Sequence, residues 1–439
     1  AIPMVLEQGT STSVAERLLD QALRAGAQAA EVYVSRSLNR PILFETNQLK
    51  QIETRDFEGY ALRLWKGGRP GLAVAYGAFE PGQLVETAIA LSQLNDPEPF
   101  ELTATPPTVC DAMYGQTATV QQMIDWGNTI LSDLVTQEFA DLHGVLELDC
   151  ETATTALLNS EGLNCRYTDQ TLSLYGAIEW VRGEDLLCVE AEQIHRNALD
   201  LSQFVASIQA RLRWAQVYSR SPVGRLPILL TGKAAELLWT TVEAALNSKR
   251  VIEGASPWSD RLLDSVVSPQ LTLLQNPHRG PFGCPFDDEG IETRCVEFIR
   301  NGILQLFYTD RTTGRLLGSG STGNGFRSGL ERYPSPGLFN LMILPGPYRF
   351  DELVAQIPEG LIVDQFLGEF GSISGDFAIN VDLGYRVKDG QIIGRVKDTL
   401  VSGNVYQALN QVVAIGRDAE WYGSCYAPSI LLEGLSVTA

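Results

Sequence analysis

The chain of 439 residues is predicted to have an α+β fold, with helices packed on sheets that are mostly antiparallel. Near the N-terminus, a helical pattern is followed by runs that alternate polar and apolar residues, as half-buried strands do. The same order recurs before residue 200, which suggests an internal duplication. In the second half, short strand-like runs are separated by Asn-Gly and Asp-Gly pairs, which favour hairpins.

The first 200 residues indicate two units of helix followed by strands, joined by a linker. Gly26 ends the first helix, and the proline-rich, acidic linker cannot continue the second. The predicted elements in order are a helix (14–25), a meander (31–37, 41–55, 59–65 and 71–77), a helix (82–94), the linker (94–108), a helix (119–136) and four strands (145–152, 155–168, 172–181 and 185–192).

The sequence pattern changes at about residue 201. A helix over 201–213 leads to the apolar run 227–230 and a further helix over 237–248, and the remainder is strand-like and rich in glycine. We therefore predict an α+β domain over 1–200, with its linker near 94–110, and a mostly antiparallel β domain over 201–439.

The charge disfavours nucleic-acid and lipid binding, and the cysteine content disfavours a structural zinc site of the CxxC type. A formal net charge of -20 disfavours binding to nucleic acid and to anionic lipid, because lysine and arginine supply most of that binding. The seven cysteines form no CxxC pair, which indicates thiols in a reducing compartment. The sequence shows neither the basic n-region nor the apolar h-region of a signal peptide. It also lacks an apolar run of about 18 residues, the length that a membrane-spanning helix needs. We expect a cytoplasmic protein with no membrane contact.

Two local patterns have a structural interpretation that outweighs a functional one. In the helix over 237–248, polar residues recur at steps of four, three and four, which is typical of an amphipathic packing helix. The acidic run Asp287, Asp288 and Glu289 could hold a hard cation, but three consecutive acids cannot all point inward. A turn with solvated charges is the favoured interpretation.

Nucleotide binding and triad catalysis are also disfavoured. Residues 318–323 match the letters of a dinucleotide fingerprint, yet they follow a helix-like run instead of a strand. The three histidines, His143, His195 and His278, each stand alone in the sequence, and no nucleophile elbow accompanies them.

A series of motifs in the second half is more informative than any one of them. PFDDEG (285–290), NGIL (301–304), GSTGNG (320–325), SGDF (374–377) and SGN (402–404) occur in the order seen in the TldD/PmbA family, often labelled "modulator of DNA gyrase". The N-terminal strands and the closing YGSCYAPSILLEGL resemble the family too, so the resemblance covers nearly the whole chain.

The resemblance implies a peptide-cleaving assembly of two related subunits in the cytoplasm. In the TldD-type subunit a helix supplies two histidines and a glutamate, and a cysteine near the C-terminus completes the zinc ligands. Such a site leaves one position for water, whose proton the glutamate takes.

Aligning this chain with that pattern places Trp239 and Ala244 at the histidine positions, Thr240 at the glutamate and Tyr422 at the cysteine. Cys425 lies three residues too late. The chain therefore resembles the PmbA (TldE-like) subunit, and we expect it to carry no catalytic residue, metal ligand or cofactor of its own. Zinc is expected in a TldD-type partner.

The resemblance also implies partners. We expect a TldD-type sister subunit, a second copy of this chain, or both, and an unfolded peptide presented as an added strand on a sheet edge. Family-motif candidates for the peptide or partner face are Asp287, Asp288, Glu289, Asp376 and Asn404. Two alternatives stay open: an independent hydrolase with a metal at the acidic residues, and a non-enzymatic protein that modulates gyrase or its inhibitors.

Overall fold

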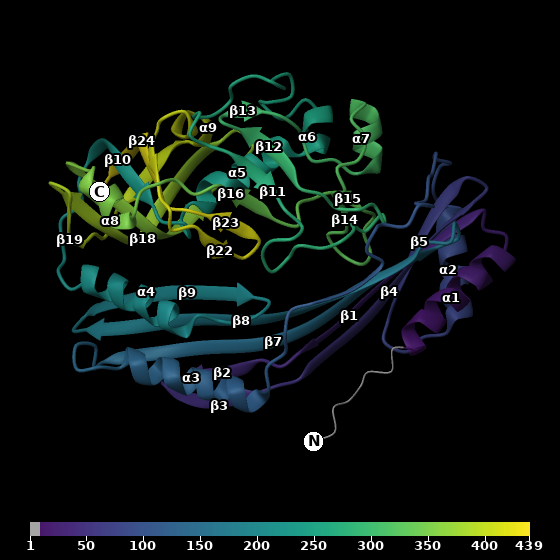
Figure 1. Cartoon of the computed structure of the whole chain (residues 1–439), viewed down its shortest axis with the longest axis horizontal. Helices are drawn as coiled ribbons and strands as arrows, with labels where there is room; N and C mark the ends of the chain where they lie inside the picture. The colour runs from purple at the N-terminus through teal and green to yellow at the C-terminus, as the bar shows by residue number, and fades with distance from the viewer. Residues whose placement is uncertain (1–8) are drawn as a thin grey trace.

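The computed structural model describes residues 9–439, and its largest element is one long, twisted sheet of nine strands (Figure 1). The strands follow the order β3-β2-β7-β1-β4-β5, with β8 on the other edge of β7 and both β6 and β9 paired to β8. They are β1 (Ala29–Asn39), β2 (Ile42–Glu45), β3 (Gln48–Ile52), β4 (Arg55–Lys66), β5 (Arg69–Tyr76), β6 (Asp111–Tyr114), β7 (Leu142–Asn159), β8 (Asn164–Arg182) and β9 (Asp185–His195).

Strand β7 unites the two predicted units in this single sheet. One of its edges pairs with β2 and then with β1, while the other pairs with β8 along almost its whole length. The four strands predicted over 145–192 are in fact three, because a turn at 160–163 divides the predicted strand 155–168, whose first part belongs to β7 and whose second part belongs to β8. Conversely, the predicted run 41–55 is split into β2 and β3 by Thr46 and Asn47, which both have positive φ.

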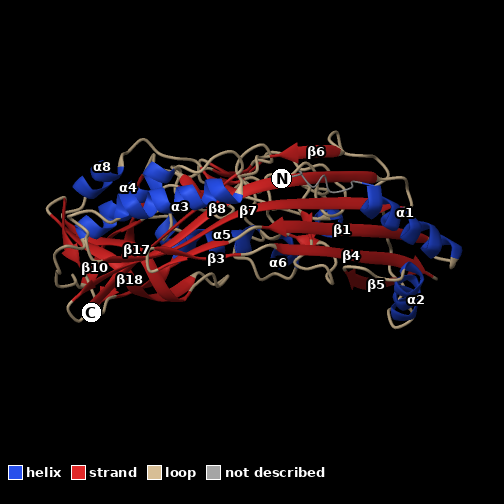
Figure 2. Cartoon of the chain, turned by 90° about the horizontal axis from the view of Figure 1, so that it is seen from below, coloured by secondary structure: helices blue, strands red, loops and turns tan. Residues whose placement is uncertain are grey.

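Four helices cover one face of the sheet. Helices α1 (Gly9–Arg24) and α2 (Pro81–Ser92) lie at one end, and α3 (Val120–Leu134) and α4 (Leu201–Trp214) lie at the other (Figures 1 and 2). Alternate residues of β7, such as Leu146 and Leu158, face these helices. At Gly71 of β5 an added Cβ would lie 2.0 Å from the backbone oxygen of Ala88 in α2, so only glycine permits this packing.

The C-terminal half consists of two further sheets, with helices between and around them. One sheet has the order β10-β17-β18-β20-β24-β21 with β19 beside β18, the second has the order β13-β12-β11-β16-β23-β22, and β14 pairs with β15. Their strands are β10 (Gly224–Leu230), β11 (Leu273–Gln275), β12 (Val296–Arg300), β13 (Ile303–Leu304), β14 (Gly325–Phe326), β15 (Ser335–Pro336), β16 (Leu341–Ile343), β17 (Glu359–Glu369), β18 (Asp376–Lys388), β19 (Gln391–Arg395), β20 (Leu400–Asn404), β21 (Val412–Ile415), β22 (Glu420–Tyr422), β23 (Cys425–Ala427) and β24 (Ile430–Thr438). The helices are α5 (Glu236–Leu246), α6 (Ser248–Ile252), α7 (Arg311–Leu317), α8 (Phe350–Ala355) and α9 (Val405–Leu409).

The apolar core continues from one half of the chain to the other. Along β10, Ile228 and Leu230 pack with α5, whereas Leu229 belongs to the core that α4 shares with the long sheet. Helix α5 therefore lies between the two C-terminal sheets, and α4 lies between the long sheet and β10. The predicted α+β class with mostly antiparallel sheets is confirmed.

The uncovered face of the long sheet meets the C-terminal half at β1, β7 and β8. Phe286 packs there with Leu157 and Cys165. The stretch predicted as a linker is packed on the same region, since the Thr103 hydroxyl donates to the backbone oxygen of Glu289 and Leu102 is buried. Within residues 9–439, the helices are all too short or too polar to cross a lipid bilayer.

Candidate functional site

Helix α5 presents two different faces. Its apolar residues, including Trp239 with 2% of its surface exposed, fill the space between the two C-terminal sheets. Glu236 is exposed and Thr240 and Glu243 are half-buried, so the polar stripe lies along an open side. The indole N–H of Trp239 is buried and has no hydrogen-bond partner within residues 9–439. The residue that the resemblance aligns with the first histidine is therefore a core residue.

The hairpin β22–β23 lies beside this helix. Tyr422 and Cys425 form its closing pair, and both pack against the core that contains Trp239. The Tyr422 ring fits closely over Gly232, where an added Cβ would lie 2.6 Å from the ring. Burial raises the pKa of the Tyr422 hydroxyl, and burial followed by the charges of Glu243 and Glu236 raises the pKa of the Cys425 thiol. Cys425 is thus a protonated thiol at neutral pH.

Asp376 and Asn404 are brought together at the start of α9. The Asn404 amide donates to the Asp376 carboxylate at 2.9 Å and to the Ser374 backbone oxygen at 3.0 Å. The Asn404 carbonyl oxygen accepts from the backbone N–H groups of Tyr406 and Gln407, which caps the helix. Both side chains therefore have a local structural role.

The acidic cluster is buried, and the predicted turn with solvated charges is wrong for Asp287 and Asp288, which are 0% and 7% exposed. Asp287 accepts backbone N–H groups from Glu289, Ile291 and Gly325. In the same way, Asp288 accepts the N–H of Arg327, and Glu289 that of Arg311. The carboxylates thus accept hydrogen bonds from the backbone N–H groups of a folded loop. The sequence could not show this, because the donor residues 325 and 327 lie far along the chain.

Burial raises the pKa of Asp288 to about 6 and that of Glu289 to about 7. Between about pH 4 and pH 7 the folded chain thus holds protons that the unfolded chain releases, so stability is lost as pH rises through this range. Lowering the pH from 8 to 5.5 is expected to raise the free energy of unfolding by roughly 1–3 kcal/mol, measured by urea denaturation. Glu289→Gln should reduce this dependence, because Asp288 still titrates, and the exposed Glu86→Gln should leave it intact; a flat wild-type profile would contradict the assignment.

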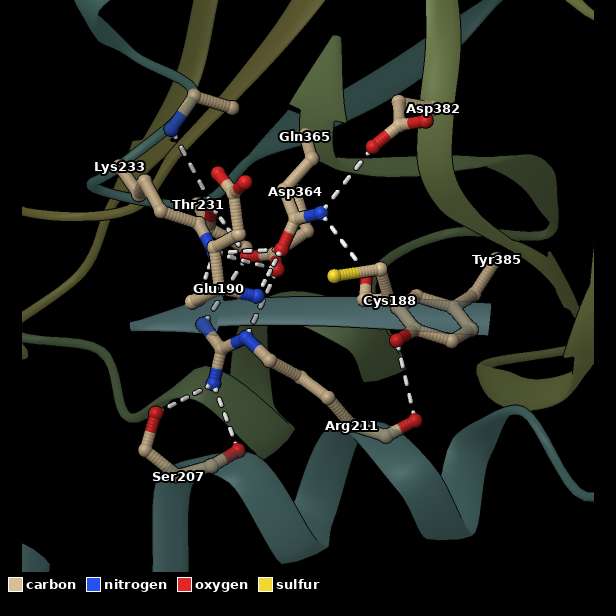
Figure 3. A network of polar contacts seen from close by, with 11 residues as sticks. Cys188, Glu190, Ser207, Arg211, Thr231, Lys233, Asp364, Gln365, Asp382 and Tyr385 are labelled. Carbon is tan, nitrogen blue, oxygen red and sulfur yellow. Dashed lines mark hydrogen bonds and ion pairs between the residues drawn. The ribbon is translucent and has the colours of Figure 1, made fainter. Parts of the chain in front are cut away.

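A polar network that the sequence did not reveal joins the two halves beside α5 (Figure 3). Asp364 of β17 is fully buried and accepts two hydrogen bonds from the Arg211 guanidinium of α4, at 2.8 and 3.0 Å. The Thr231 hydroxyl donates at 2.8 Å, and the Lys233 amine lies 3.1 Å away. Burial would raise the pKa of Asp364, but Arg211 and Lys233 outweigh it and hold that pKa well below its usual range.

Gln365 extends the network to β9 (Figure 3). Its amide nitrogen donates to the backbone oxygen of Cys188 at 3.0 Å, and its amide oxygen accepts the backbone N–H of Glu190 at 2.8 Å. Lys233 donates to the backbone oxygen of Glu190 at 2.7 Å. The sequence feature that could have indicated these contacts is the presence of an aspartate and a glutamine inside the apolar run GLIVDQFLG.

A cavity of about 360 Å³ opens beside this network. It lies between α4, β9, the turn before α5 and the hairpin β22–β23. Its lining includes Glu192, Trp214, Lys233, Phe350, Glu420 and Tyr422. Polar, charged and aromatic groups therefore converge next to the first turn of α5.

The remaining motifs do not converge on a site. The glycine-rich stretch 318–323 follows helix α7, which Gly318 ends in a left-handed conformation. His143 and His195 lie on β7 and β9, and His278 lies in a loop. Within the described part of the chain, 9–439, the structure contains no cluster of three or more His, Cys, Asp or Glu side chains suited to a metal ion.

Comparison with protein families identifies two matched regions of the chain. Residues 223–439 match the PmbA/TldA metallopeptidase C-terminal domain, and residues 30–92 match PmbA/TldA metallopeptidase domain 1. The chain belongs to the PmbA/TldD family. Family members carry a metallopeptidase description, so the matched region of this chain is metallopeptidase-like.

Individual relatives of the PmbA/TldD family are similar over different shares of the chain. The Metalloprotease TldD homolog of Buchnera aphidicola is 27% identical over 49% of each chain, so this match spans about half of the relative's length. A Metalloprotease of Methanothermobacter thermautotrophicus is 25% identical over 89% of this chain and 88% of its own. The crystal structure of TldE from Thermococcus kodakarensis superposes with a TM-score of 0.85 at 21% identity, covering 97% of this chain and 100% of that one, which shows a shared fold.

The four side chains that the resemblance aligns with the zinc ligands and the glutamate do not fit zinc. Trp239 and Ala244 offer no ligand atom, and Thr240 offers no carboxylate to act as a base. Tyr422 supplies only a partly buried phenol whose pKa is raised. The donor set that a metallopeptidase needs is therefore missing at these four positions.

Proposed function

We propose that this chain is the PmbA/TldE-like, non-catalytic subunit of a zinc metalloprotease assembly that acts on unfolded peptides in the cytoplasm. A TldD-type sister subunit supplies the zinc site. This chain pairs with that subunit, stabilises its zinc cleft and helps to present the peptide as an added strand. Self-association is a second arrangement open to the chain.

One observation carries this proposal. Trp239 stands where the family's zinc ligand would be, and it is a core residue between two sheets instead of a side chain at an open cleft. A side chain that is packed in the core cannot ligate a metal at an open cleft, as expected of a subunit that leaves the chemistry to its sister. The alternative of a metal at the acidic residues has less support, because backbone N–H groups occupy the oxygens of Asp287 and Asp288.

A peptidase assay on an unfolded peptide library tests the proposal. We expect cleavage when this chain and its TldD-type sister are mixed, little or none with either chain alone, and complete loss of cleavage after chelation of zinc. The reason is that the open zinc position and the glutamate base come from the sister alone. Zinc-dependent cleavage by this chain by itself would contradict the proposal, and so would a sister whose activity this chain does not change.

A further inference from the structure

The cavity beside α5 lies along an open strand edge. Among the strands of residues 9–439, β9 pairs only with β8, so every second residue of β9 directs its backbone groups away from the sheet. At Cys188 and Glu190 these groups are occupied by the side chains of Gln365 and Lys233. At Glu192, the next residue on this edge, the backbone N–H and C=O have no protein partner within residues 9–439. An extended peptide can pair there, and Gln365 and Lys233 mark where the pairing must stop.

The same place carries uncompensated negative charge. Glu192 and Glu236 form no ion pair within residues 9–439, and Glu420 has only a hydrogen bond from Gln203, at 2.6 Å. The nearby Lys233 does not form an ion pair with these glutamates, because its three N–H bonds are directed to Asp364, Gln365 and the backbone oxygen of Glu190. Burial raises the pKa of Glu192 and of Glu420, and the Arg211 guanidinium, which is already paired with Asp364, offsets only part of this rise at Glu420.

Aromatic rings complete the cavity. Trp214 and Phe350 stack with their centroids 5.3 Å apart, and the ring of Tyr422 lies among the other lining residues. Such a wall suits the long apolar stem of a lysine or arginine side chain, whose charged end then reaches the carboxylates. A volume of about 360 Å³ has room for one such side chain and part of its neighbours.

We propose that this cavity is a subsite for a lysine or arginine side chain of an extended peptide whose backbone pairs with Glu192 on the open edge of β9. The inference rests on the proposed function in one respect, that the ligand is an unfolded peptide. It adds the class of peptide: the subsite selects basic residues, with Glu192 and Glu420 as the counter-charges.

Fluorescence anisotropy with this chain alone tests the subsite, without the sister subunit. The probes are two labelled ten-residue peptides that differ at one central position, lysine in one and the neutral norleucine in the other. We expect the lysine peptide to bind roughly tenfold more tightly, since a hydrogen-bonded ion pair replaces an uncompensated carboxylate. N-methylation of the amide beside the lysine should weaken binding, because it removes a donor needed for strand pairing.

The double variant E192Q/E420Q should remove the preference for lysine, so that the lysine and norleucine peptides bind with the same affinity. The control variant E86Q, which alters an exposed glutamate on α2, should keep the preference. Equal binding of the two peptides by the wild type would overturn the inference, as would a preference that survives in E192Q/E420Q or an absence of binding to both. None of these results bears on the mixed peptidase assay, so the proposed function and the subsite can fail separately.

Discussion

Replacing Asp364 with asparagine is expected to lower the free energy of unfolding by about 3–5 kcal/mol, the range seen when one partner of a buried ion pair is removed. The carboxylate is fully buried and accepts hydrogen bonds from Arg211 and Thr231, with Lys233 at 3.1 Å. An amide would leave two cations close together with no anion, and its own NH₂ group would face their donors. The measurement is urea denaturation followed by circular dichroism.

Asp382→Asn is the matched control, because Asp382 also bonds to this network, through Gln365, but lies exposed on the neighbouring strand. Its cost should stay below about 1 kcal/mol. Adding Lys233→Met to the Asp364→Asn variant should recover part of the loss, since it removes one of the two stranded cations. If Asp364→Asn unfolds within 1 kcal/mol of the wild type, the network does not hold the two halves together.

The local elements were predictable where a short pattern determines the conformation. The Asn301-Gly302 and Asp389-Gly390 pairs both adopt the positive φ values that a tight hairpin requires, and they join neighbouring strands as predicted. The polar stripe of residues 237–248 likewise predicted a packing helix, and α5 is one. Such features depend on residues within one turn or one hairpin.

The features that depend on distant partners were not predictable. Nothing near Asp364 indicates that its guanidinium partner lies on a helix 153 residues earlier. The burial of Asp287 and Asp288 depends on N–H groups more than 30 residues ahead, so their own sequence indicated a solvated turn. For the same reason the prediction of a degenerate site depended on the resemblance to a family, whereas the cavity at the edge of β9 emerged only from the packed structure.

Replacing Trp239 with alanine is expected to cost about 3–5 kcal/mol of stability, as for other large aromatic side chains deleted from a core. The indole is buried between the two C-terminal sheets, where no neighbouring group can readily fill the space. Trp239→Phe should cost much less, because the phenyl ring keeps most of the volume and removes an indole N–H that has no partner in the described chain. Urea denaturation of the two variants and the wild type gives the comparison.

Trp421→Ala serves as the control, since Trp421 lies on the hairpin beside α5 but is only half-buried. If Trp239→Ala costs no more than this control, the side chain does not fill the core, and the observation that carries the proposed function is lost. If the expected difference appears, Trp239→His should also be destabilising. A position that now supports the fold cannot return to a zinc ligand without loss, because the smaller and polar imidazole would leave a void and an unsatisfied nitrogen in the core.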